Sequence, residues 1–104
     1  MYKVFVSMGL KGRNFEEVTA DLTRAQKWIF ENLVDDRYDD VYVIDNLDCS
    51  TTEDGRRLWC LGEAIKKLGD CDACFFVKGW ENYNGCRAEM KICNLYGIRT
   101  IIET

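Results

Sequence analysis

Four short hydrophobic segments alternate with three longer amphipathic segments along this chain, and this alternation constrains the fold more than any other feature. The hydrophobic segments are rich in β-branched and aromatic residues and cover residues 2–8, 41–45, 73–77 and 99–103. Apolar residues recur at helical spacing between them, over residues 15–33, 58–68 and 85–96. Strands that alternate with helices predict an α/β protein with a parallel sheet.

The order of the strands follows from the handedness of their connections. Right-handed crossovers favour the flavodoxin-like order 2-1-3-4, a three-layer sandwich around a four-stranded parallel sheet. Ligands of such folds bind beyond the carboxyl ends of the first and third strands, where the connections diverge. The two loops that meet there are SMGLKGRN, residues 7–14, and KGWENYNG, residues 78–85. Asp45 and Asn46 follow the edge strand and are expected to lie farther from the site.

Capping signals mark the ends of the expected helices. Asn14 is expected to be the N-cap of the first helix, with Glu17 three residues later, and Gly97 is expected to end the third. The acidic stretch 35–40 indicates a turn, and the polar stretch 46–55 indicates a loop that leads into the second helix.

The composition excludes several classes of function. The chain has 104 residues, of which 47% are apolar, and no proline, which predicts one folded domain over residues 1–104. A formal charge of −4 argues against a nucleic-acid partner. The first residues are charged too early for a signal peptide, and no apolar run reaches about 18 residues, so no membrane partner is expected. We therefore expect a soluble cytoplasmic protein.

Six cysteines and the absence of histidine limit the possible chemistry. Cys71 and Cys74 form a CxxC pair, for which structural thiols are favoured over a metal or redox site, because a helix ends there instead of beginning. Without histidine, catalysis must rest on carboxylate, Tyr, Lys or Cys groups. We expect neither a bound metal nor another cofactor.

The first loop combines flexible glycines with polar and cationic side chains. Glycines let backbone N–H groups approach a ligand, and a loop that ends at a helix N-terminus suits a phosphate or the hydroxyls of a ribose. The alternative is an ordinary turn, because the loop matches neither a Walker A nor a GxGxxG motif. The candidate ligand-binding residues here are Ser7, Met8, Gly9, Gly12 and Arg13.

The second loop offers aromatic, amide and carboxylate side chains. Trp80 could stack on a planar base, or it could pack over the end of the third strand. The polar residues could hydrogen-bond a sugar, or they could face water. The candidate ligand-binding residues here are Gly79, Trp80, Glu81, Asn84 and Gly85.

Glu89 is the candidate catalytic residue, one turn into the third helix. Helical spacing predicts that it shares a face with Gly85 and Tyr96, apart from the core residues Cys86 and Cys93. The helix N-terminus is expected to keep the carboxylate ionised. An ionised carboxylate can attack an anomeric carbon or stabilise the cation that forms there. The alternative is a solvated residue on a helix surface.

Three segments resemble the nucleoside 2-deoxyribosyltransferase-like superfamily, and within it a group of short, uncharacterised bacterial and phage members. They read VFVSMGLKGRN, LWCLGEAIKKLGDCDACFFVKGWENYNGCRAE and YGIRTI, and the resemblance covers nearly the whole chain. It implies a flavodoxin-like fold and a pocket for a nucleoside or its 5′-monophosphate. In characterised members a Glu, four residues after a Gly, attacks C1′ of the deoxyribose, a spacing that Gly85 and Glu89 match. Ser7, Gly12 and Arg13 resemble the first loop of nucleotide-cleaving members.

One position departs from the pattern of this family. Active members carry an Asp on the helix before the third strand, where this chain has Ala64. Glu63 is adjacent, but a step of one residue along a helix rotates the side chain by about 100°.

The resemblance and Glu89 together give the first hypothesis, an N-glycosidase or 2-deoxyribosyltransferase that uses Glu89 on a nucleoside or nucleoside 5′-monophosphate. The alternatives are an inactive nucleotide-binding module, or a structural or interaction protein.

The topology also predicts a partner chain. No helix follows the fourth strand, so part of one sheet face beside the first helix is expected to lack a cover. Phe75, Phe76, Ile101 and Ile102 are expected to leave apolar surface there. Because large exposed apolar patches mark interfaces, we expect a homodimer or a larger homo-oligomer.

Overall fold

The computed structural model describes residues 1–33, 40–47 and 57–104 of the chain. The turn expected at 35–40 and the loop expected at 46–55 fall mainly outside these residues. Among the helices of the described part, none has the length and apolar character that crossing a bilayer requires.

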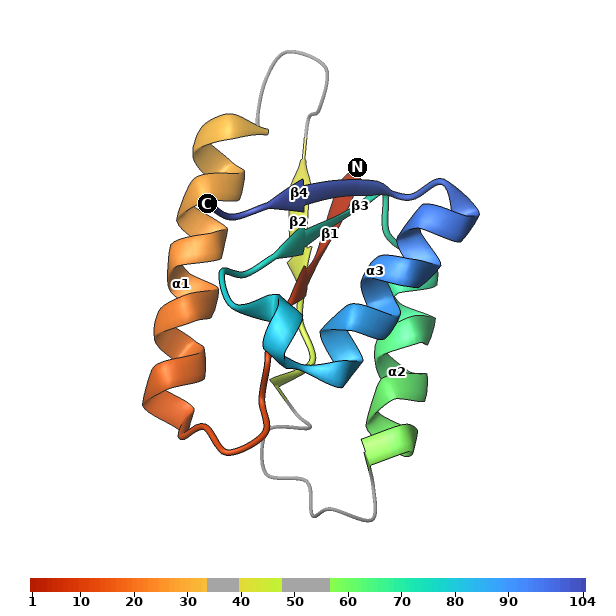
Figure 1. Cartoon of the computed structure of the whole chain (residues 1–104). Coiled ribbons are helices and arrows are strands. Elements are labelled where there is room, and N and C mark those ends of the chain that lie inside the picture. Colours follow the sequence, from red (N-terminus) through yellow and green to blue (C-terminus); the bar gives the residue numbers. More distant parts are fainter. Residues whose placement is uncertain (34–39, 48–56) are drawn as a thin grey trace.

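Four parallel strands form the sheet in the order β2-β1-β3-β4, which confirms the predicted flavodoxin-like α/β topology (Figure 1). The strands are β1 (Tyr2–Ser7), β2 (Val41–Ile44), β3 (Ala73–Phe76) and β4 (Arg99–Ile102). β1 and β3 pair directly, with Val4 opposite Ala73 and Ser7 opposite Phe76. Both strands are buried over nearly their whole length, as expected of central strands that are covered on both faces.

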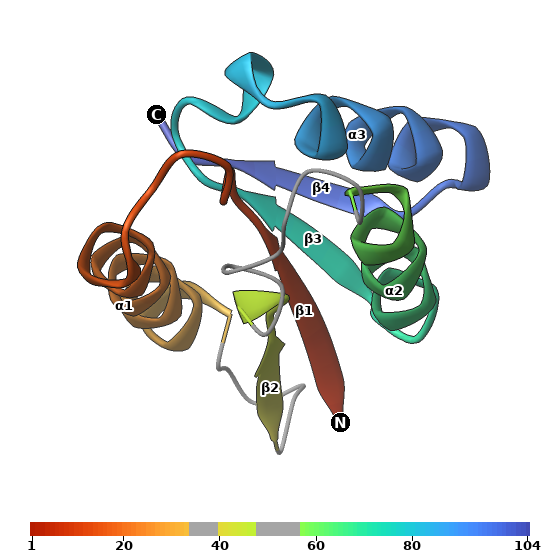
Figure 2. The same ribbon diagram turned by 90° about the horizontal axis from the view of Figure 1, so that it is seen from below.

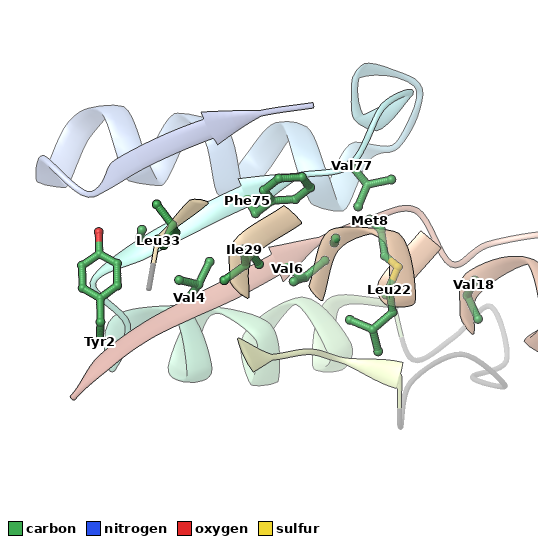
Figure 3. Packing of buried hydrophobic residues seen from close by; sticks show 12 residues of the cluster. Tyr2, Val4, Val6, Met8, Val18, Leu22, Ile29, Leu33, Phe75 and Val77 are labelled. Atoms are coloured by element: carbon green, nitrogen blue, oxygen red, sulfur yellow. The ribbon is translucent and has the colours of Figure 1, made fainter. Parts of the chain in front are cut away.

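The helix α1 (Phe15–Asn32) covers one face of the sheet. It begins where expected, because the Glu17 backbone N–H donates to the Asn14 side-chain oxygen at 2.8 Å. Its buried residues recur every three or four positions, which gives one apolar stripe: Val18, Leu22, Ala25 and Ile29. This stripe packs against residues of β1 and β3 that point to the same face (Figure 3).

The helices α2 (Arg57–Gly69) and α3 (Asn84–Tyr96) cover the opposite face (Figure 2). The core on this side includes Phe5 of β1, Phe76 of β3 and Leu68 of α2. The helix α3 ends at Gly97, whose φ of 71° lies in the left-handed region that glycine adopts readily. Before α3 in the chain, the 3-10 turn η3 (Trp80–Asn82) occupies part of the segment that the sequence predicted to be an irregular loop.

The expected apolar surface beside α1 is smaller than predicted. Phe75 is only 1% exposed and Phe76 is fully buried, so the prediction was wrong for both residues. The Trp28 ring of α1 lies 5.4 Å from the Phe75 ring, between centroids, and helps to cover it. Ile101 and Trp28 stay partly exposed on the face that α1 covers, whereas Ile102, at 51% exposure, lies on the opposite face of β4.

Candidate functional site

A cavity of about 930 Å³ lies at the carboxyl ends of the central strands. The loop after β1, the helix α2 and the start of α3 contribute its lining. Its position is the one predicted for a ligand site in this topology. Its volume is within the range of small-molecule pockets, about 300–1,000 Å³.

A buried hydrogen-bonded pair, Ser7 and Glu89, lies at the cavity: Glu89 lines it, and Ser7, a predicted ligand-binding residue, lies outside the lining. The Ser7 hydroxyl donates to the Glu89 carboxyl at 2.7 Å, and the two residues are 1% and 5% exposed. Ser7 ends β1 on the face that also carries Phe5, because alternate residues of a strand point the same way. Glu89 reaches it from α3, and the side chain lines the cavity.

Glu89 lies on the buried face of α3, which corrects the face predicted for it. Cys86, Glu89 and Cys93 are the buried residues of this helix, and their spacing of three and four positions forms one stripe. The sequence pattern missed this arrangement because it assigned the stripe to apolar residues only. The alternative of a solvated surface residue is also wrong.

Burial raises the pKa of Glu89 to about 7, and the hydrogen bond from Ser7 opposes part of this rise. The sequence predicted an ionised carboxylate held by the helix N-terminus, but desolvation outweighs that effect. At neutral pH the carboxyl group is therefore divided between its protonated and ionised forms. Such a group can accept or donate a proton, or attack as a nucleophile once ionised.

The first loop lines the cavity with Met8, Gly9 and Gly12, and Lys11 joins them. Gly9 is in close contact with the Tyr83 ring: a Cβ atom at this position would lie 2.2 Å from ring carbons. Gly12 has a φ of 74°, so the turn favours glycine there.

Arg13 is outside the residues that line the cavity, although the sequence made it a ligand candidate. Its guanidinium donates to the Gly9 carbonyl at 3.0 Å and forms an ion pair with Asp21 at 2.5 Å. Arg13 therefore ties the loop after β1 to α1, on the side of the loop away from the cavity lining. The sequence offered little signal for this role, because the partner lies eight residues along the chain on α1.

The second loop contributes Asn84 and Gly85 to the cavity, together with Asn82 and Tyr83. Gly79, Trp80 and Glu81 lie outside the lining. The Trp80 ring is 5.3 Å from the Phe76 ring, between centroids, so it packs over the end of the third strand, as the alternative interpretation had it.

The helix α2 supplies a mainly apolar wall that includes Leu58, Leu61 and Ala64. Ala64, the position at which the resemblance leads one to expect Asp, is 3% exposed and lines this cavity. Glu63 does not replace it, because it is outside the lining and its carboxylate pairs with Lys66 at 3.1 Å.

Asn46 also lines the cavity, although the sequence placed it farther away. The Lys67 ammonium group donates to the side-chain oxygen of Asn46 at 2.9 Å. The side-chain amide nitrogen of Asn46 donates to the Cys60 carbonyl at 3.3 Å. The pairing of β2 with β1 was the available signal, because it brings the carboxyl ends of these two strands together.

In the described part, Cys71, Cys74, Cys86 and Cys93 are free thiols, and Cys49 lies outside it. Burial raises the pKa of Cys71 to about 11 and that of Cys86 to about 12, so neither is a ready nucleophile at neutral pH. Across residues 1–33, 40–47 and 57–104, no group of three or more His, Cys, Asp or Glu residues is placed to hold a metal ion.

Comparisons with family models, with curated proteins and with solved structures gave no match for this chain. The function must therefore be inferred from the cavity, from the buried Glu89 and from the sequence around Gly85 and Glu89. A buried carboxyl with a tuned pKa in a concave, mainly apolar site is the arrangement expected of a small-molecule enzyme or binding protein.

Proposed function

We propose that this protein cleaves the N-glycosidic bond of a nucleoside or nucleoside 5′-monophosphate, as a hydrolase or a 2-deoxyribosyltransferase. The Ser7–Glu89 pair carries the proposal, because it places a buried carboxyl with a pKa near 7 at the cavity wall. The motif resemblance around Gly85 and Glu89 supplies the substrate class.

In this proposal the ionised Glu89 attacks C1′ of the sugar. The bond from C1′ to the base nitrogen breaks, and the nitrogen takes the electron pair and a proton from solvent. A glycosyl ester of Glu89 results, and water or a second base then displaces the carboxylate. The Ser7 hydroxyl holds one carboxyl oxygen. Among the described residues, this is the single hydrogen bond of the Glu89 carboxyl, so its other oxygen is available to attack.

The remaining lining suits the two ends of such a substrate. Asn46, Asn82 and Asn84 offer amide groups that hydrogen-bond sugar hydroxyls or the edge of a base. Leu58 and Leu61 offer an apolar wall for the face of a base.

A nucleotide-binding module without turnover is the second candidate, and Ala64 favours it. A methyl group at this position of the cavity wall cannot exchange a proton with a leaving base. The same cavity would then bind its ligand without breaking a bond.

The test follows free base by chromatography during incubation with a panel of deoxynucleosides and their 5′-monophosphates, with and without an acceptor base. We expect base release by the native chain and its loss in Glu89→Gln. Glu31→Gln is the matched control, because Glu31 is an exposed carboxylate on α1 and is expected to keep full activity. Saturable binding by calorimetry without base release would favour the module, and neither binding nor release would contradict both candidates and leave an interaction protein.

We also propose that the protein works in the cytoplasm as a homodimer or a larger homo-oligomer. Free thiols at Cys71, Cys74, Cys86 and Cys93 fit a reducing compartment. The candidate interface is the exposed edge strand β4, with Ile101 beside Trp28 on one face and Ile102 on the other, and we call these three residues the β4 surface.

A further inference from the structure

A second hollow of about 610 Å³ lies beside the cavity, and two residues line both. These shared residues are Asn82 and Tyr83. The second hollow has a different chemical character, because charged side chains dominate its lining: Arg13, Asp21, Arg24, Lys78 and Glu103. Tyr83 therefore stands between a mainly apolar cavity and a charged hollow.

Most of the charge in the second hollow is internally paired. Asp21 pairs with Arg13 at 2.5 Å and with Arg24 at 3.0 Å, and Arg24 pairs with Glu103 at 2.7 Å. Lys78 donates its backbone N–H to the Glu103 carboxylate at 2.8 Å, and its ammonium group forms no ion pair among the described residues but also helps to lower the pKa of that carboxyl. The lining side chains of the hollow thus comprise three cationic groups, two of them guanidinium groups, and two carboxylates.

The cavity itself is poorly equipped for a phosphate. Lys11 is the single cationic residue in its described lining, and its side chain is exposed to solvent. The Glu89 carboxyl lies in the same cavity, and a phosphate dianion near it would disfavour its ionised form. Tight recognition of phosphate normally uses a guanidinium or several charge-assisted donors.

Tyr83 is held firmly in the dividing position. Its ring lies against Gly9, where a Cβ atom would approach ring carbons to 2.2 Å, and its backbone N–H donates to the Trp80 carbonyl at 3.1 Å. The carbonyl of Gly9 in turn accepts a hydrogen bond from Arg13 at 3.0 Å. The Tyr83 ring and the Arg13 guanidinium therefore both contact Gly9, and both residues line the second hollow.

We propose that Tyr83 is a specificity-determining residue that restricts the cavity to unphosphorylated nucleosides. Its ring closes the cavity off from Arg13 and Lys78, the groups that would receive a 5′-phosphate. The inference rests on the proposed function for the identity of the ligand. Of the two substrates named in the proposed function, the nucleoside would then bind and the nucleoside 5′-monophosphate would be excluded.

The test compares a deoxynucleoside with its own 5′-monophosphate, by calorimetry for binding and by chromatography for base release. We expect the native chain and Tyr83→Phe to prefer the deoxynucleoside, because both keep the ring. In Tyr83→Ala the preference is expected to shift toward the monophosphate by about tenfold or more, the size of one charge-assisted contact. Adding Lys78→Gln to Tyr83→Ala is expected to reverse much of that shift.

The outcomes separate this inference from the proposed function. Selective deoxynucleoside binding without base release would contradict the enzyme and leave the role of Tyr83 intact. A native preference for the monophosphate, or equal preferences in Tyr83→Ala and Tyr83→Phe, would overturn the inference. Binding of neither ligand would overturn both. Thermal unfolding checks each variant, and Tyr83→Leu replaces Tyr83→Ala if the latter does not fold.

Discussion

At the scale of single residues, Glu89 shows how a side chain becomes reactive through burial. A carboxyl that is 5% exposed, with one hydrogen bond from Ser7, cannot keep the ionised form as readily as a solvated one. The same burial that raises its pKa to about 7 makes its ionised form costly to the fold. Reactivity and reduced stability are therefore linked at this position.

This link predicts a pH dependence of folding stability. The ordinary pKa of 4.5 applies to the unfolded chain, and about 7 applies to the folded one. Between these values the folded state binds one more proton, so the contribution of Glu89 to stability falls as pH rises and is lost above about 7. Glu89→Gln should therefore gain roughly 3 kcal/mol relative to the native chain between pH 4 and pH 8.

Urea unfolding at a series of pH values measures this difference. Glu31→Gln serves as the control, because it makes the same chemical change at an exposed position of α1. Stability profiles of the native chain and Glu89→Gln that stay parallel from pH 4 to pH 8 would contradict the burial argument.

At the scale of secondary structure elements, α1 and the loop before it show what sequence patterns can predict. The apolar spacing and the Asn14 cap are local signals, and both appear in the structure as expected. The support of the loop by Arg13 and Asp21 depends on how the helix is placed, so the sequence could not predict it. The burial of Glu89 is a different case: its spacing from Cys86 and Cys93 was a local signal, which the prediction passed over because it assigned the buried stripe of α3 to apolar residues only.

The cap of α1 gives a prediction at this scale. Asn14→Ala removes the oxygen that accepts the Glu17 N–H, so it should lower the free energy of unfolding by about 1 kcal/mol. Asn14→Asp keeps an acceptor and should stay near the native value. The comparison uses urea unfolding at pH 7. Equal destabilisation by both substitutions would show that the hydrogen bond is not what stabilises this helix start.

At the scale of the whole molecule, the topology was predictable and the surface was not. Strand order follows from alternation and handedness, which are properties of the sequence pattern. Which apolar residues stay exposed depends on packing between distant elements, and Trp28 covering Phe75 is such a case. The inclusion of Asn46 in the cavity likewise depends on where α2 settles, because its contacts reach Cys60 and Lys67.

Self-association through the β4 surface is the prediction at this scale. We expect sedimentation at micromolar concentration to detect a dimer or a larger oligomer. Ile102→Lys should shift the chain toward monomer, because it places a charge on the apolar β4 surface. A native chain that sediments as a monomer would contradict the proposed assembly.

The distance along the chain between the two partners of the buried pair has a consequence for folding. Ser7 and Glu89 are 82 residues apart in sequence, and the central strands that bring them together pair across a similar span. Contacts of such high sequence separation form slowly, because much of the chain must be ordered before they close. A nascent or partly folded chain therefore carries an ordinary surface carboxylate at Glu89. Its raised pKa arises only when folding is nearly complete, so the proton affinity of this one residue depends on the pairing of the central strands.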